Sequence, residues 1–226
     1  MKAVLILAAL ACAGPAMAAD NTLSASERKA GWKLLFDGKS MDAWRTFKKP
    51  ASDWKVVDGA LAPEPKVSGD LMTKETFGSF ELAFDWRISP RGNSGVMYRV
   101  TEAGQQSYWS GPEYQVLDNS RGEPPLQRAG ALYDLYAPTV DATKPVGEFN
   151  RSRLIVNGAH VEHWLNGQKV AEYELGSPEF KAKVAASKFR AWPFGTSPTG
   201  HIALQNHGDE VWYKNLKVRV LAPASR

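Results

Sequence analysis

The segment Phe80–Ile88 alternates apolar and polar residues with a period of two, and this pattern constrains the fold more than any other feature of the chain. Successive side chains of a strand point to opposite faces of a sheet, so the alternation predicts a half-buried antiparallel strand. Two Asn-Gly pairs, at 157–158 and 166–167, separate further alternating runs and predict a three-stranded meander. Many strands without long helices predict an all-β protein, a two-sheet antiparallel β-sandwich with a few short helices.

The remaining elements follow from local signals. Ser24 opens a capping box, and Ser177 followed by Pro178 begins a second short helix. The segments 201–207 and 211–220 are expected to form a last pair of strands around a Gly-Asp turn. Residues 185–200 are expected to form a long loop, and loops of this length are usually functional or mobile.

Residues 1–19 have the pattern of a secretory signal peptide, with Lys2, an apolar run and small residues at 16 and 18 as the cleavage site. Cys12 leaves a lipoprotein open, which is less favoured because the apolar run before it is short. Removal of this peptide removes the single cysteine, so no disulfide is expected. Residues 20–226 are predicted to form one domain.

Charge and hydropathy argue against two classes of partner. The formal net charge of +4 is spread along the chain, which indicates a solvated surface and no nucleic-acid site. No second apolar run is long enough to span a membrane. The 8 Trp, 7 Tyr and 9 Phe residues mostly suit a core, but aromatic rings in loops also line sugar-binding grooves.

The stretch GPEYQVLDN, residues 111–119, places carboxyl groups in an apolar strand. Glu113 and Gln115 share a face, and Asp118 joins them only if a β-bulge inserts a residue. Sandwich-fold glycosidases carry Glu, Asp and Glu at this spacing, and here Gln115 replaces the middle carboxylate. Because a retaining glycosidase needs two carboxylates, ordinary glycoside hydrolysis is disfavoured. The alternative is an edge strand with solvated carboxylates.

Four further polar positions are candidates for the same groove. In HIALQNHG, Gln205 and His207 share a face, and a histidine at a strand end suits proton transfer near neutral pH. A turn histidine bonded to backbone is the alternative. Asn93 and Arg99 are an even number of residues apart, so on a regular strand both side chains would face one groove. The alternative is that residues 93–95 form a hairpin turn. His163, between Glu and Trp in a hairpin, is interpreted as structural.

No metal or cofactor motif occurs. The four histidines are scattered, and there is no phosphate loop, nucleophile elbow or dinucleotide fingerprint. A divalent cation held in the groove by Glu113 and His207 stays open, and no other cofactor is expected.

An ordered set of segments resembles the 3-keto-disaccharide hydrolase domain family, over residues 31–221. The segments that carry the resemblance are LFDGKSMDAW (35–44), GDLMTKETFGSFEL (69–82), NSGVMYR (93–99), EYQVLD (113–118), GALYDLY (130–136), HWLNG (163–167) and HIALQNHG (201–208).

This resemblance implies a concanavalin A-like jelly roll with an active groove on the concave face of one sheet. It implies a protein of the bacterial periplasm or outer envelope that acts on a small sugar substrate, a glycoside oxidised at C3. The groove positions that it carries over are Asn93, Arg99, Glu113, Gln115, Asp118, Tyr133, Asp134, Gln205 and His207. Tyr108, Trp109 and Trp192 are expected to stack on the sugar or its aglycone.

The chemistry of such a substrate suits these residues. A ketone at C3 acidifies the C2 proton, so a base can start β-elimination of the aglycone from C1, and added water completes a net hydrolysis. Glu113 or His207 is expected to be the base and the other the acid, while Asn93, Arg99 and Gln115 hold the ketone and hydroxyls. The alternatives are a non-catalytic carbohydrate-binding module of the same fold and an interaction domain with an exposed apolar patch.

Overall fold

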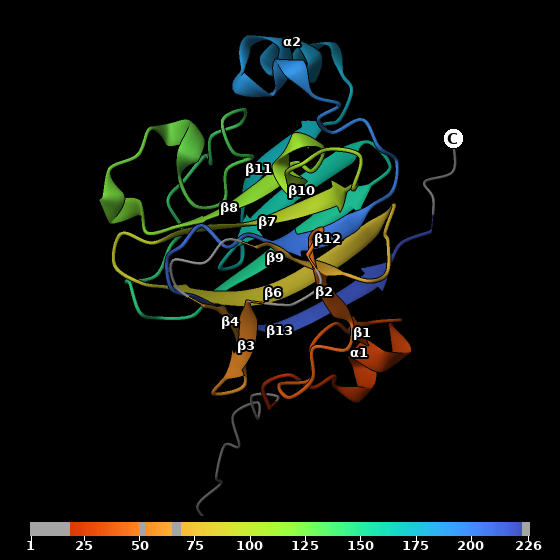
Figure 1. Cartoon of the computed structure of the whole chain (residues 1–226), viewed down its shortest axis with the longest axis vertical. Helices are drawn as coiled ribbons and strands as arrows, with labels where there is room; N and C mark the ends of the chain where they lie inside the picture. The colour runs from red at the N-terminus through yellow and green to blue at the C-terminus, as the bar shows by residue number, and fades with distance from the viewer. Residues whose placement is uncertain (1–18, 50–52, 65–68, 223–226) are drawn as a thin grey trace, which may run out of the picture.

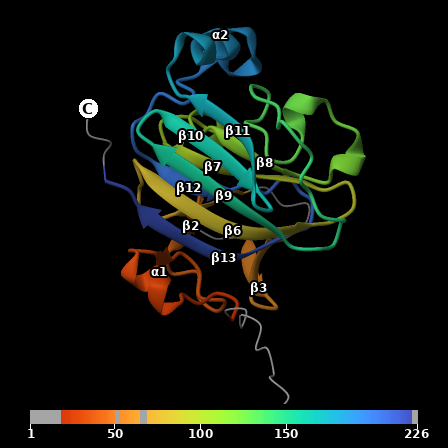
Figure 2. The ribbon, with the colours of Figure 1, turned by 180° about the vertical axis from the view of Figure 1, so that it is seen from behind.

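The computed structural model describes residues 19–49, 53–64 and 69–222, so the predicted signal peptide with Cys12 lies outside the described residues except for Ala19. Two antiparallel sheets pack face to face (Figure 1), and Figure 2 shows the larger one from behind. The strand orders are β11-β10-β9-β6-β13-β4-β3, with β1 beside β13, and β2-β5-β12-β7-β8. The predicted antiparallel β-sandwich is confirmed. None of the helices in the described ranges has the length and apolar character to span a membrane.

The larger sheet contains β1 (Lys33–Leu34), β3 (Trp54–Val57), β4 (Ala60–Pro63), β6 (Phe80–Ile88), β9 (Asn150–Asn157), β10 (His160–Leu165), β11 (Gln168–Glu174) and β13 (Val211–Val220). The smaller sheet contains β2 (Trp44–Thr46), β5 (Leu71–Thr73), β7 (Asn93–Val100), β8 (Glu113–Leu117) and β12 (His201–Leu204). The helices are α1 (Ala25–Lys29), α2 (Pro178–Ala186) and the 3₁₀ turns η1 (Ser107–Trp109), η2 (Asn119–Arg121), η3 (Pro125–Gln127) and η4 (Lys188–Ala191).

Local signals account for most of these elements. The alternating segment is β6, and the two Asn-Gly turns join β9, β10 and β11 into the predicted meander. Ser24 and Glu27 form the predicted capping box of α1. The Ser177 hydroxyl accepts a hydrogen bond from the Phe180 amide at 3.1 Å and begins α2, as predicted.

The expected pairing of the last two strands is wrong. β12 ends at Leu204 and pairs with β5 and β7, whereas β13 lies in the other sheet and pairs with β6. The chain crosses between the two layers after β12, through Gly208 at a φ of 92°. Alternation shows which face of a strand is buried but does not identify its neighbour, so the sequence pattern could not exclude this crossing.

The core lies between the two sheets. Phe84 of β6 meets Tyr114 of β8 edge to face at 5.4 Å between ring centroids. His163 is fully buried beside them; its Nδ1 lies 2.9 Å from the Gly130 carbonyl oxygen and its Nε2 2.8 Å from the Tyr173 hydroxyl. Burial lowers the pKa of His163 to about 4. The structural interpretation of this histidine is confirmed.

The opposite face of the smaller sheet has a different character. A small apolar cluster of Phe47, Met72, Met97 and Ala203 covers part of this face. The strands carry polar side chains at the neighbouring positions, and these side chains form the candidate site.

Candidate active site

Successive side chains of β8 point to opposite faces of the smaller sheet. Tyr114 and Val116 enter the core, so Glu113 and Gln115 emerge on the outer face of the smaller sheet. They line a cavity of about 270 Å³ together with residues from β7, from the segment after β12 and from η4. The other lining residues are Asn93, Tyr108, Tyr133, Lys188, Phe189, Trp192, Gln205 and His207.

The Glu113 carboxyl group is the most unusual feature of this cavity. It is only 5% exposed, and among the described residues it has no hydrogen-bond or ion-pair partner. Burial, aided by the charge of Asp70 and opposed by that of Lys188, raises its pKa to about 8. A buried carboxyl group without a partner is costly, and such groups gather at functional sites.

Gly95 on the adjacent strand β7 makes room for this carboxyl group. A Cβ atom at Gly95 would lie 1.9 Å from Oε1 of Glu113, far inside van der Waals contact. Any larger residue at this position would push the carboxyl group aside. The glycine in the Asn-Ser-Gly sequence is therefore a requirement of the site, and the segment is a strand rather than the hairpin turn considered from the sequence.

Two amide side chains add acceptors without partners. Gln115 donates from Nε2 to Oδ1 of Asn93 at 3.1 Å, which fixes the orientation of both amides. Oε1 of Gln115 and Oε1 of Gln205 are buried and accept no hydrogen bond from described residues. Buried polar atoms are usually paired, so these oxygens are suited to accept hydrogen bonds from ligand hydroxyl groups.

Asp70 is a carboxylate of this region that sequence reasoning missed. It accepts hydrogen bonds from the Ser107 hydroxyl and from the Asn206 amide, the latter at 3.0 Å, and burial raises its pKa. It lines a hollow of about 380 Å³ that shares Tyr108, Gln205 and His207 with the cavity at Glu113. In a sequence, a Gly-Asp pair before a short strand indicates a turn. The position of Asp70 beside this cavity becomes apparent only from the order of the strands in the sheet.

Aromatic rings form one wall. Trp192 stacks on Trp109 at 5.0 Å and 12°, and meets Tyr108 edge to face at 6.0 Å. The Lys188 ammonium group lies 4.2 Å from the centroid of the Tyr133 ring. Burial raises the pKa of Tyr133 to about 12, so its hydroxyl keeps its proton. The segment 185–200, predicted as a long loop, contains the end of α2 and η4, because the serine at 187 caps a further helical turn. It brings a cation and an aromatic ring to the cavity.

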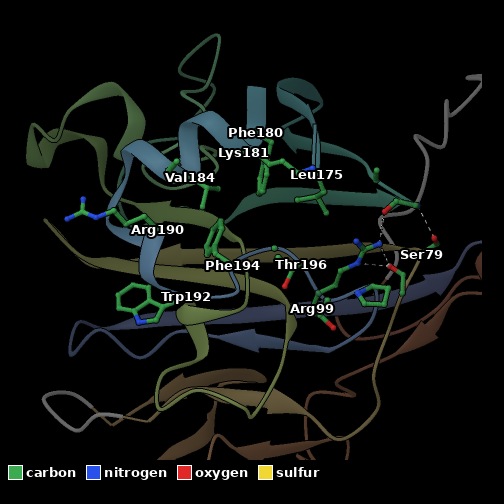
Figure 3. Close-up of a pocket in the computed structure, with 18 residues that line it drawn as sticks. Ser79, Arg99, Leu175, Phe180, Lys181, Val184, Arg190, Trp192, Phe194 and Thr196 are labelled. Carbon is green, nitrogen blue, oxygen red and sulfur yellow. Dashed lines mark hydrogen bonds between the residues drawn. The ribbon is translucent and has the colours of Figure 1, made fainter. Parts of the chain in front are cut away.

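Arg99 does not line this cavity, although the alternation along the strand predicted that it faces the same groove as Asn93. β7 has one more residue than β12 between the pairs Val100–His201 and Met97–Ala203, so the alternation breaks there. Arg99 adopts a φ of 52°, and its side chain lines a neighbouring pocket (Figure 3).

Asp118 and Asp134 also lie outside the lining of the cavity. β8 pairs with β7 in continuous register, so the expected bulge is absent and the strand ends at Leu117. Asp118 caps η2 instead, accepting hydrogen bonds from the amides of Ser120 at 2.9 Å and Arg91 at 2.6 Å. Asp134 has a φ of 65° and turns the chain after Tyr133. Trp109 supports Trp192 from behind and is not itself a lining residue.

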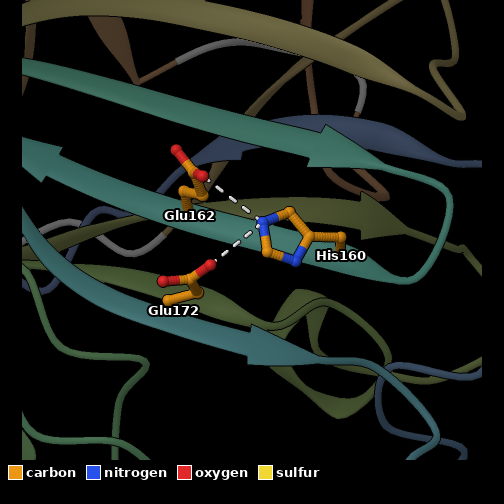
Figure 4. A group of neighbouring side chains, drawn as sticks. All are labelled: His160, Glu162 and Glu172. Atoms are coloured by element: carbon orange, nitrogen blue, oxygen red, sulfur yellow. Dashed lines mark hydrogen bonds and ion pairs between the residues drawn. The ribbon is translucent and has the colours of Figure 1, made fainter.

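A group with metal-ligand geometry lies elsewhere. Among the residues that the structure describes, the one group of three whose ligand atoms approach within 4.8 Å is His160, Glu162 and Glu172, on β10 and β11 (Figure 4). Lys169 lies 3.7 Å from Glu162 and also pairs with Glu172, so a cation of the protein already offsets part of their negative charge. A cation bound by Glu113 and His207 stays a prediction.

The fold and cavity define a jelly-roll β-sandwich protein with an aromatic-walled groove on one sheet that holds a protonatable carboxyl group. Residues 31–219 match the family described as 3-keto-alpha-glucoside-1,2-lyase-like domain, and the chain belongs to this family. It is 32% identical to a 3-keto-disaccharide hydrolase of Bacteroides thetaiotaomicron, over 84% of this chain and 79% of that protein. The resemblance expected from the sequence is confirmed.

Two crystal structures of candidate glycosyl hydrolases from Parabacteroides distasonis are also similar. One superposes with a TM-score of 0.85 at 33% identity, covering 90% of this chain and all (100%) of the other. The second has a TM-score of 0.67 at 27% identity and covers 84% of this chain and 99% of the other.

Proposed function

We propose that this protein is a carbohydrate-active enzyme that cleaves 3-keto-glycosides by elimination followed by hydration. The observation that carries the proposal is the buried, unpartnered carboxyl group of Glu113, which faces a cavity shared with His207. A conventional glycosidase pair is replaced here by one carboxyl group beside an amide. The family description, which names a 1,2-lyase for 3-keto-alpha-glucosides, supports the same chemistry.

The first step needs a base and the second an acid. His207, an exposed imidazole on the cavity rim, removes the C2 proton, and the C–H electron pair forms an enolate with C3. The enolate then collapses to form the C1–C2 double bond as the C1–O bond breaks. Glu113 gives its proton to the leaving oxygen, because with a pKa of about 8 it is mostly protonated at neutral pH.

Hydration completes the reaction. Water adds across the double bond, with hydroxide joining C1 and a proton joining C2, and the product is the free 3-keto sugar. The net change is hydrolysis without oxidation or reduction. Glu113, deprotonated by the elimination, is in the right state to accept a proton from the attacking water.

The enolate oxygen needs stabilisation. Lys188 supplies a positive charge at the cavity, and the Tyr133 hydroxyl is a donor that keeps its proton. These two groups take the role that the sequence assigned to Arg99. The free oxygens of Gln115 and Gln205 accept hydrogen bonds from sugar hydroxyls.

The test compares a 3-keto-glucoside with its unoxidised parent. Only the keto substrate should be cleaved, and the Glu113→Gln and His207→Ala variants should each lose about 10²–10⁴-fold in rate. A substrate deuterated at C2 should react more slowly and release its label to water. Glu148→Gln, an exposed carboxylate away from the cavity, is the matched control.

The outcomes separate the candidate reactions. Retention of the C2 deuterium in the product would refute elimination. Cleavage of the unoxidised glucoside would indicate ordinary glycoside hydrolysis. A rise in melting temperature with either sugar, without turnover, would make the protein a carbohydrate-binding module, the alternative that the fold also allows. Loss of activity with a chelator would place a cation in the mechanism.

A further inference from the structure

A second, larger cavity lies beside the candidate active site. Its volume is about 910 Å³, and it is bounded by α2, by the segment after η4, and by the turns before β6 and after β9. Trp192 is the lining residue that both cavities have in common. The larger cavity has room for an organic molecule of ordinary ligand size.

Apolar side chains make up much of its wall. Leu175, Phe180, Val184 and Phe194 lie around it in Figure 3. None of the described residues that line it is acidic. Lys181 and Arg190 are exposed at its edge, and Figure 3 shows the Arg190 side chain pointing away from the centre. The cavity is thus apolar and free of negative charge.

Arg99 is the buried cation of this cavity. Its side chain donates hydrogen bonds to the Gly78 and Gly158 carbonyls, from Nη2 at 3.0 and 2.6 Å. Among the described residues no group accepts a hydrogen bond from Nη1, and no carboxylate lies within ion-pair distance. Yet the residue is only 6% exposed. Buried arginines are normally paired with an acid, because an unpaired buried charge is expensive.

The backbone holds this cation in place. Arg99 has a φ of 52°, a conformation that costs a non-glycine residue energy and persists only where the surroundings impose it. Gly200 crosses directly behind it, where a Cβ atom would lie 2.3 Å from the Arg99 carbonyl carbon. Burial lowers the pKa of Arg99, as expected for a cation without an anionic partner.

We propose that this cavity is a second binding site, for an organic anion with an apolar body and one carboxylate group that pairs with Arg99. The planar guanidinium group matches a carboxylate, and the aromatic and aliphatic walls match an apolar ring or chain. The site shares Trp192 with the cavity at Glu113, but Arg99 does not line that cavity, and the proposal does not depend on the reaction proposed there.

The test uses 2-naphthoate and its neutral analogue 2-naphthamide as probes, with binding followed by calorimetry and tryptophan fluorescence. Naphthoate should bind at least tenfold more tightly than the amide, because a hydrogen-bonded charge contributes more than a neutral partner. Arg99→Met should abolish this preference. Lys39→Met, an exposed cation on the N-terminal side of the molecule, should retain it.

A second variant is needed because Arg99 also ties two turns together. Val184→Trp adds a bulky ring to the α2 wall of the cavity and leaves the Arg99 side chain unchanged in sequence, and it should abolish binding of both probes. Glu113→Gln should leave binding unchanged. The proposal is overturned if wild-type protein shows no saturable binding of naphthoate, if both probes bind equally, or if Val184→Trp binds as well as the wild type.

Discussion

The raised pKa of Glu113 makes a quantitative prediction about stability. Its pKa of about 8 in the folded protein compares with an ordinary value of 4.5, which the unfolded chain should have. Because the folded state holds this proton more tightly, the carboxyl group favours folding below about pH 4.5. That contribution is lost as the pH rises through 8. The difference between the folded and unfolded pKa of Glu113 corresponds to roughly 5 kcal/mol of unfolding free energy, at about 1.4 kcal/mol per pH unit.

The Glu113→Gln variant isolates this effect, because the amide keeps the shape of the side chain and does not titrate. We expect the variant to gain about 4 kcal/mol in unfolding free energy relative to the wild type between pH 5 and pH 9. Urea unfolding monitored by tryptophan fluorescence at pH 5, 7 and 9 measures this difference. Glu148→Gln, on the surface, provides the matched control.

A difference between wild type and Glu113→Gln that stays constant within about 1 kcal/mol from pH 5 to 9 would refute the reasoning. It would mean that water or a neighbouring donor solvates the carboxylate in the folded protein. Glu113 would then be ionised at neutral pH and could not act as the acid.

Three further predictions address the same chain. If Glu113 is the acid, kcat/KM should fall above about pH 8, where it loses its proton; a rise in that range would make it the base. Gly95→Ala should lower kcat/KM by about 10²-fold with an unchanged circular dichroism spectrum, since its methyl group displaces the carboxyl group; wild-type activity would contradict this. His163 has a pKa of about 4, lowered by burial, so its stabilising effect is present above pH 6.5 and is lost as the pH falls. The stability advantage of wild type over His163→Gln in urea should therefore shrink by about 2 kcal/mol from pH 7 to pH 5, and an unchanged advantage would refute it.

The sequence predicted the fold well because its signals are local. Alternation in β6, the Asn-Gly turns of the meander and the serine caps of both α-helices each depend on residues close together in the chain. The error concerned β12 and β13, whose partners lie far away in sequence. Which strands pair depends on how two whole faces are buried, and a local pattern does not contain that information.

The same distinction explains the site. Glu113, Gln115 and Asn93 lie on regular strand, so parity placed them correctly on one face. Arg99 follows a one-residue irregularity, which reverses parity and turns its side chain into another cavity. Asp118 lies one residue beyond the end of β8, where the rule no longer applies. Parity predicts a side chain's direction only while the hydrogen-bond ladder is unbroken.

Asp70 and Lys188 show what tertiary structure adds. They come from segments more than a hundred residues apart, and both act electrostatically on Glu113, with Asp70 raising its pKa and Lys188 lowering it. The two influences oppose each other, and burial decides the outcome. A substrate that covers the cavity removes water and strengthens both electrostatic interactions. An enolate near Lys188 would also pair with the charge of this lysine. Lys188 lowers the pKa of Glu113 and so favours release of its proton, and an enolate paired with Lys188 weakens that effect. The charge that develops on the substrate and the release of the Glu113 proton are therefore coupled through one lysine.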